Sequence, residues 1–73
     1  MKLPVVTGRQ VLAALHRAGF VLDHVRGSHH ILCSPGGARA TVPVHAGDTL
    51  APKTLQSILR QAGLTVEEFT ALL

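Results

Sequence analysis

The sequence predicts a small α+β domain in which a three-stranded antiparallel sheet carries helices on one face. Apolar residues recur at helical spacing in three segments, and each segment follows a residue typical of a helix start. Between the first two of these segments lie three short strand-like runs separated by turn signals, which most simply form an antiparallel meander. The predicted order is therefore helix, three strands, helix, helix, in a single domain of residues 1–73.

The first predicted helix follows Thr7, because Thr7 and Gln10 stand in the reciprocal positions of a capping box. Its apolar face is formed by Val11, Leu12, Leu15 and Ala18. Gly19 is expected to end the helix. The opposite face is basic, with Arg9 and Arg17, and suits either a phosphate backbone or plain solvent.

The three strands are predicted at 20–26, 29–34 and 39–44. Gly27 and Ser28 form the first turn, and the Pro-Gly-Gly run at 35–37 forms the second. Pro43 indicates that its end of the third strand lies at an edge of the sheet or lacks a hydrogen-bonding partner. Because side chains alternate along a strand, His29 and His30 point to opposite faces, and the pattern leaves open which face is buried.

Pro52 is expected to be the first residue of the second helix. Its apolar stripe is formed by Leu55, Ile58, Leu59 and Ala62. Gly63 ends this helix, and a short third helix begins at Thr65, which is capped with Glu68. This last helix is predicted to bury Phe69 and Leu72.

This order of elements is that of double-stranded-RNA-binding domains, in which the N-terminus of the helix after the sheet meets RNA phosphates. Lys53 occupies that position, where a helix N-terminus favours a bound anion. Seven Lys and Arg against four Asp and Glu give a net charge of +3, which indicates a polyanion, an acidic partner or a basic surface that serves solubility. A single cysteine, no apolar run of about 20 residues and no secretory leader lead us to expect a cytoplasmic protein without a membrane segment.

The stretch Arg26-Gly27-Ser28-His29-His30 predicts a phosphate-handling site. Gly27 allows a tight turn whose backbone N–H groups can face a ligand, and Ser28 adds a hydroxyl. Arg26 can hold an anion with two hydrogen bonds, and the imidazole of His29 changes charge near neutral pH. From the residues alone, a structural role for His29 at the start of a strand is equally consistent.

Three blocks of the sequence resemble the HicA toxins, also called the YcfA-like family. They are residues 27–31 (GSHHI), 41–45 (TVPVH) and 55–63 (LQSILRQAG), in register over almost the whole chain. The resemblance implies the same double-stranded-RNA-binding fold and an endoribonuclease toxin that cleaves mRNA to arrest growth. It also implies that His29 is the catalytic residue, and that a HicB-type antitoxin binds the toxin in a hetero-oligomer and covers the active site. Leu32 stands where this family frequently has a larger residue.

The residues themselves argue against a metal site and call for no cofactor. His29 and His30 are adjacent on a strand and point apart, and clustered carboxylates for Mg²⁺ are lacking, while Cys33 is predicted to be a small buried hydrophobe. The remaining chemistry is acid–base cleavage of RNA, in which the 2′-hydroxyl is the nucleophile and His29 the base. Phosphate contacts are expected from Arg26, Gly27, Ser28 and Lys53, with His30 supporting or contacting the RNA.

The acid for the leaving oxygen stays open between His24, His30, His45 and water. Two other function classes also stay open: a catalytically inert double-stranded-RNA-binding module, and a basic protein-interaction domain.

Overall fold

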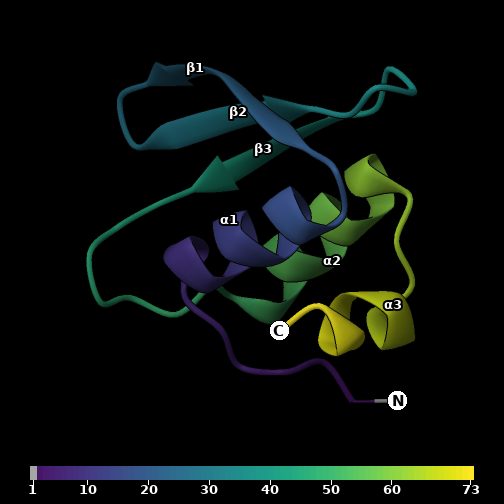
Figure 1. Cartoon of the computed structure of the whole chain (residues 1–73). Coiled ribbons are helices and arrows are strands. Elements are labelled where there is room, and N and C mark those ends of the chain that lie inside the picture. Colours follow the sequence, from purple (N-terminus) through teal and green to yellow (C-terminus); the bar gives the residue numbers. More distant parts are fainter. Residues whose placement is uncertain (1) are drawn as a thin grey trace.

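A computed structural model of the chain describes residues 2–73, and its elements follow the predicted order (Figure 1). The elements are α1 (Gly8–Arg17), β1 (Val21–Arg26), β2 (His29–Cys33), β3 (Arg39–Pro43), α2 (Pro52–Ala62) and α3 (Val66–Ala71). The predicted α+β class, strand order and helix starts are confirmed, and each predicted strand is one residue too long at one end.

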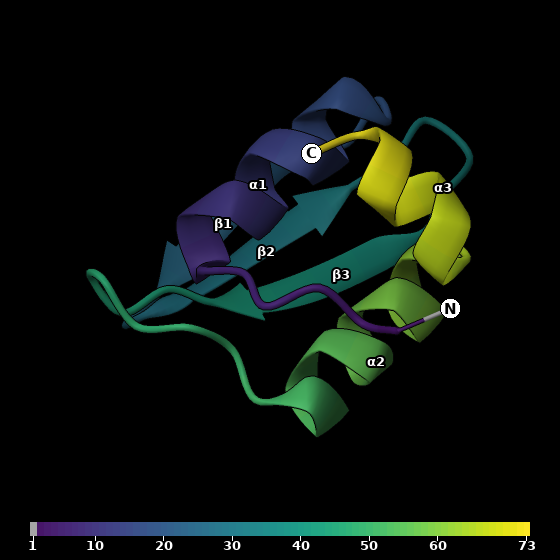
Figure 2. The ribbon, with the colours of Figure 1, turned by 90° about the horizontal axis from the view of Figure 1, so that it is seen from below.

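The sheet has the order β1-β2-β3 with both pairs antiparallel, so β3 is an edge strand, as Pro43 predicts. In the β2–β3 pair, His30 lies opposite Val42 and Leu32 opposite Ala40. Val42, Ala40 and Leu32 are buried, so this is the face that the helices cover. His29 and Ile31 therefore lie on the other face, which the helices leave open (Figures 1 and 2).

The helices and the covered face of the sheet share one hydrophobic core. It consists of Val6, Val11, Ala14, Leu15, Phe20, Leu32, Ala40, Val42, Leu55, Ile58, Leu59, Ala62 and Phe69. The predicted stripe of α2 is fully confirmed, whereas Ala18 is exposed and Ala14 takes its place in the core. Ala18 follows the last residue of α1, where the chain has already turned away toward β1. Leu72 is only half-buried, because it lies beyond the end of the short α3.

Helix α1 approaches β3 so closely that its first residue must be glycine. A Cβ atom on Gly8 would lie 2.5 Å from the carbonyl oxygen of Pro43 and 3.1 Å from Cα of Val44, and both of these are backbone atoms. The capping box of Thr7 and Gln10 forms as predicted and fixes this end of the helix. The start of α1 is thus held against the end of β3.

Side chains of α2 and α1 tie the helix layer to the rest of the fold. Gln61 Oε1 accepts a hydrogen bond of 2.9 Å from the backbone N–H of Thr41. The Gln61 side chain thus satisfies a backbone donor on the unpaired edge of β3. Arg17 Nη1 donates a hydrogen bond of 2.7 Å to the carbonyl oxygen of Leu72 and so joins α1 to the end of α3. The predicted capping box of Thr65 and Glu68 also forms and starts α3.

Strand β1 differs from the other two strands because it is exposed along its whole length. Val21, Leu22 and Val25 are 58%, 54% and 48% exposed, since the helices pack mainly against β3, at the other edge of the sheet. Within residues 2–73, every helix is too short or too polar to cross a membrane.

Candidate active site

His29 is the first residue of β2 and follows directly on the turn at Gly27 and Ser28. Gly27 has φ of +60°, a conformation that side chains disfavour, which explains glycine at this position. The carbonyl oxygen of Ser28 accepts a hydrogen bond of 2.8 Å from the N–H of Val44, so the turn is fixed to the chain after β3. The His29 side chain is consequently presented on the open face by an anchored turn, and it is exposed.

The open face contains a shallow pocket of about 330 Å³ around His29. It is lined by His24, Arg26, His29, Ile31, Arg39 and Thr41, which come from all three strands. Arg26 lies directly opposite His29 in the β1–β2 pair. Two guanidinium groups and two imidazoles thus surround a small concave surface, a combination suited to a phosphate group.

A β-bulge in β1 places His24 in this pocket. Leu22 pairs with Leu32, but His24 pairs with Ile31, so Asp23 is the extra residue between them. Without the bulge, His24 would share the covered face with Leu22. With the bulge, Leu22 faces the helices while His24 and Arg26 point to the open side.

Asp23 connects the two ends of the pocket. Its Oδ2 accepts a hydrogen bond of 2.6 Å from His24 Nδ1 and lies 3.5 Å from Nη2 of Arg39. The bond from His24 lowers the pKa of Asp23 below its ordinary value of 3.8, and Arg39 adds to this effect, although desolvation acts in the opposite direction. The Asp23 carboxylate therefore stays ionised and holds the His24 ring through Nδ1.

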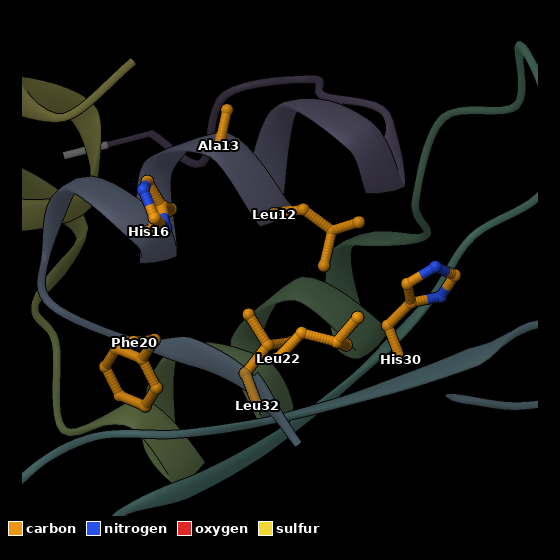
Figure 3. A pocket seen from close by; sticks show the side chains of 7 residues that line it. All are labelled: Leu12, Ala13, His16, Phe20, Leu22, His30 and Leu32. Atoms are coloured by element: carbon orange, nitrogen blue, oxygen red, sulfur yellow. The ribbon is translucent and has the colours of Figure 1, made fainter. Parts of the chain in front are cut away.

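His30 lies on the covered side, in a second hollow (Figure 3). This groove of about 320 Å³ lies between α1 and the first two strands and is lined by Leu12, Ala13, His16, Phe20, Leu22, His30 and Leu32. Nδ1 of His30 is 3.4 Å from the carbonyl oxygen of Ser28, so its ring contacts the same turn from the opposite side to His29. Leu32 lies on the floor of the groove and is 3% exposed, which makes it a core residue.

The structure brings only part of the predicted site together. Arg26 and His29 line one pocket on the open face, whereas Lys53 lies exposed in the first turn of α2. Helix α2 belongs to the helix layer on the covered side of the sheet (Figure 2). Cys33 was predicted to be buried, but it is only half-buried because it shares the open face with His29. No group of three or more metal-ligating side chains occurs among residues 2–73.

The profile of the family described as HicA toxin of bacterial toxin-antitoxin matches residues 8–64, which is most of the chain. The chain belongs to the HicA toxin family. The matched segment begins at the first residue of α1 and ends just after α2, so it contains the whole sheet and both faces of β2. A comparison with curated proteins finds no match.

Two residues that line the pocket of this HicA-family chain, Arg39 and Thr41, were missed in the sequence, and so was Asp23, which bonds to His24 and Arg39 beside it. Alternation with period 2 places residues 22, 24 and 26 on one face, and only the bulge separates Leu22 from the other two. Arg39 reaches the pocket from the first position of β3, which pairs with the edge of β2 opposite to β1. An Asp directly before a His in a predicted strand is the one signal that could have indicated a hydrogen-bonded pair.

Proposed function

We propose that this HicA-family chain is the toxin of a toxin–antitoxin pair and acts as an endoribonuclease that cleaves mRNA without a metal ion. The observation that carries the proposal is the exposed His29, with two arginines in the same pocket, in a chain of this toxin family. A solvent-accessible imidazole can take a proton from the RNA, and the arginines can neutralise the phosphate. A histidine used only for packing would not need this setting.

The proposed reaction uses the nucleophile that RNA itself supplies. His29 removes the proton of a 2′-hydroxyl group, and the 2′-oxygen attacks the adjacent phosphorus to give a 2′,3′-cyclic phosphate. Arg26, one strand away, and Arg39 hold the phosphate and stabilise the charge that develops on its oxygens. The N–H groups around Gly27 and Ser28, together with Lys53 and His30, are proposed to position the RNA beyond the scissile group.

The test is an RNA cleavage assay with wild type, His29→Ala and His16→Ala. We expect cleavage that persists in EDTA and leaves 2′,3′-cyclic phosphate or 3′-phosphate ends. His29→Ala should lose about 10²–10⁴ in rate, the typical contribution of a general base. His16→Ala is the matched control, because His16 is an exposed histidine on α1 outside the open-face pocket. Full activity of His29→Ala, or activity that returns only with Mg²⁺, would contradict the proposal.

The inert alternatives make a different forecast for the same assay. The exposed Lys53 at the start of α2 is compatible with a domain that binds double-stranded RNA without cleaving it. Such a module would bind RNA but leave it intact in the wild-type protein, and a pure protein-interaction domain would do neither.

The proposed antitoxin is a HicB-type protein that binds the toxin and covers the open face. A net charge of +3 and a pocket with two arginines favour an acidic partner surface. We expect a co-purified HicB-type protein to suppress cleavage at equimolar ratio. Its binding should protect the open-face pocket, for example His29, from modification by diethyl pyrocarbonate. Unchanged cleavage in the complex would contradict this part of the proposal.

A further inference from the structure

We propose that His24, held by Asp23, is the general acid of the reaction and donates its proton to the leaving 5′-oxygen. This inference rests on the proposed function and names a second catalytic residue for the same site. The observations that carry it are the position of His24 relative to His29, its hydrogen bond to Asp23, and the bulge that turns it to the open face.

The two histidines lie near each other on the open face of the sheet. His24 pairs with Ile31, and His29 is two residues before Ile31 on the same strand and the same face. Such diagonal neighbours in an antiparallel pair are about 7–8 Å apart. A phosphodiester group fits between two rings at this separation with a hydrogen bond of about 2.6–3.2 Å to each. One ring can then meet the 2′-oxygen while the other meets the 5′-oxygen.

The two rings differ in their hydrogen-bond partners. His24 Nδ1 donates to the Asp23 carboxylate at 2.6 Å, which fixes the ring and leaves Nε2 as the nitrogen that meets a substrate. Among residues 2–73, His29 forms no such pair with a carboxylate. The two rings therefore differ in their surroundings, and we assign the ring that the carboxylate holds in place, His24, as the acid and His29 as the base.

Of the three histidines that the sequence offered as the acid, only His24 lines the pocket with His29. Of the groups left open by the sequence, His30 faces the groove on the covered side and His45 lies in the exposed loop after β3, outside the pocket. The charged and titratable groups around the phosphate position are Asp23, His24 and Arg26 from β1, His29 from β2 and Arg39 from β3. Among the side-chain types in this set, imidazole is the one that ordinarily serves as a proton donor or acceptor in catalysis.

The resulting step balances protons and electrons. His29 takes the proton of the 2′-hydroxyl as the bond from the 2′-oxygen to phosphorus forms. The bond from phosphorus to the 5′-oxygen breaks, its electron pair remains on that oxygen, and the proton comes from Nε2 of the His24 imidazolium. The products are a 2′,3′-cyclic phosphate and a 5′-hydroxyl, and solvent restores the two protonation states.

The experiment compares two substrates that differ only in the need for an acid. One is an RNA oligonucleotide with a single scissile ribonucleotide, and the other is the same oligonucleotide with sulfur in place of the bridging 5′-oxygen. A thiolate leaves without being protonated, so the second substrate reacts without a general acid. His24→Ala and His24→Gln should lose about 10²–10⁴ in rate on the oxygen substrate and regain nearly wild-type rates on the sulfur substrate. His29→Ala should stay slow on both.

Asp23→Asn tests the positioning role of the carboxylate. It should show the same dependence on the leaving group as His24→Ala with a smaller loss, because the ring remains but is no longer held. His16→Ala, outside the pocket, is the control and should match wild type on both substrates.

Three outcomes would overturn the inference. Equal losses of His24→Ala and His24→Gln on both substrates would assign His24 a structural or binding role, while cleavage by wild type would leave the proposed function intact. If His45→Ala, and not His24→Ala, is slow on the oxygen substrate and fast on the sulfur substrate, the acid lies in the loop after β3. A wild-type protein that cleaves neither substrate would overturn the proposed function together with this inference.

Discussion

The two faces of β2 carry neighbouring residues with very different surroundings. His30 and Leu32 point toward the helices, where Leu32 is 3% exposed, whereas His29 and Ile31 point to the open face of the sheet. The covered face has one histidine at the margin of an apolar core. The open face has two histidines and two arginines around a shallow pocket. The covered face therefore contributes to the small core that a chain of this length can form. The open face carries the residues that we propose to act on RNA.

The largest expected difference between the two faces is in stability. Leu32→Ala should lower the free energy of unfolding by about 2–5 kcal/mol. The reason is that Leu32 is buried beside the groove on the covered side, and its removal leaves a space that the neighbouring side chains do not fill. Ile31→Ala on the half-buried open side should cost about 1 kcal/mol. Urea unfolding of both variants measures the difference. Equal losses would mean that the open face is packed in solution as well as the covered one.

A second expected effect concerns the close approach of α1 to the sheet. Ala is ordinarily a better helix residue than Gly, so Gly8→Ala in a free helix would be stabilising. Here the new Cβ would meet backbone atoms of Pro43 and Val44, and we expect a loss of about 1–3 kcal/mol.

Gly36→Ala is the control for Gly8→Ala, because its Cβ would meet only the Ser34 hydroxyl at 3.8 Å. Thermal unfolding should show a clear decrease for Gly8→Ala and little change for Gly36→Ala. A stabilised Gly8→Ala variant would show that α1 can move away from the end of β3 at no cost.

The covered side was the part of the fold that the sequence predicted well. The stripe of Leu55, Ile58, Leu59 and Ala62 and the two threonine capping boxes follow from local periodicity and local hydrogen bonds. The buried face of β2 was left open, because each face of that strand offers one histidine and one aliphatic residue. Only the pairing with Ala40 and Val42 on β3, which is a tertiary contact, decides between them.

The open side could be predicted only in part. Arg26 and His29 are close in sequence on the two arms of a tight turn, so their pairing is a local consequence of that turn. The contribution of Asp23 and His24 depends on a bulge, and Arg39 is brought in by a strand on the other side of β2. Lys53 fits an anion site by its place at a helix start, but the sequence does not show that its helix belongs to a different layer from His29.

The salt dependence of RNA binding tests whether RNA contacts the open face of the sheet, the start of α2 or both. Each phosphate contact releases condensed cations, so its loss should reduce the slope of log K against log salt by about 0.7 for a single strand. We expect this reduction for Arg26→Ala in the pocket and for Lys53→Ala on α2, measured with an uncleavable 2′-O-methyl RNA. Arg60→Ala, at the exposed end of α2, is the charge-matched control.

Arg26→Ala and Lys53→Ala should differ in their effect on the rate of RNA cleavage. Arg26→Ala should also slow cleavage of bound RNA, because Arg26 lies opposite His29, whereas Lys53→Ala should affect binding alone. A slope that is unchanged in Lys53→Ala would restrict the RNA to the open face. Unchanged slopes in both variants would point to the basic face of α1, with Arg9 and Arg17.

The smallest expected effect is the pH dependence contributed by Asp23. Its folded pKa lies below the ordinary value of 3.8, chiefly through the hydrogen bond from His24, so the unfolded chain takes up this proton first as the pH falls. The stabilisation by the pair is therefore fully present above about pH 4–5 and is lost as the pH falls through the folded pKa. Because the His24 and Asp23 side chains are 44% and 47% exposed, solvent screens the pair and the effect should be small. Thermal unfolding of wild type and Asp23→Asn at pH 7, 5 and 3 should show a difference that shrinks at the lowest pH, while Asp48→Asn in the loop after β3 serves as the control. A difference that stays constant from pH 7 to 3 would show that Asp23 acts through the shape of the bulge and not through its charge.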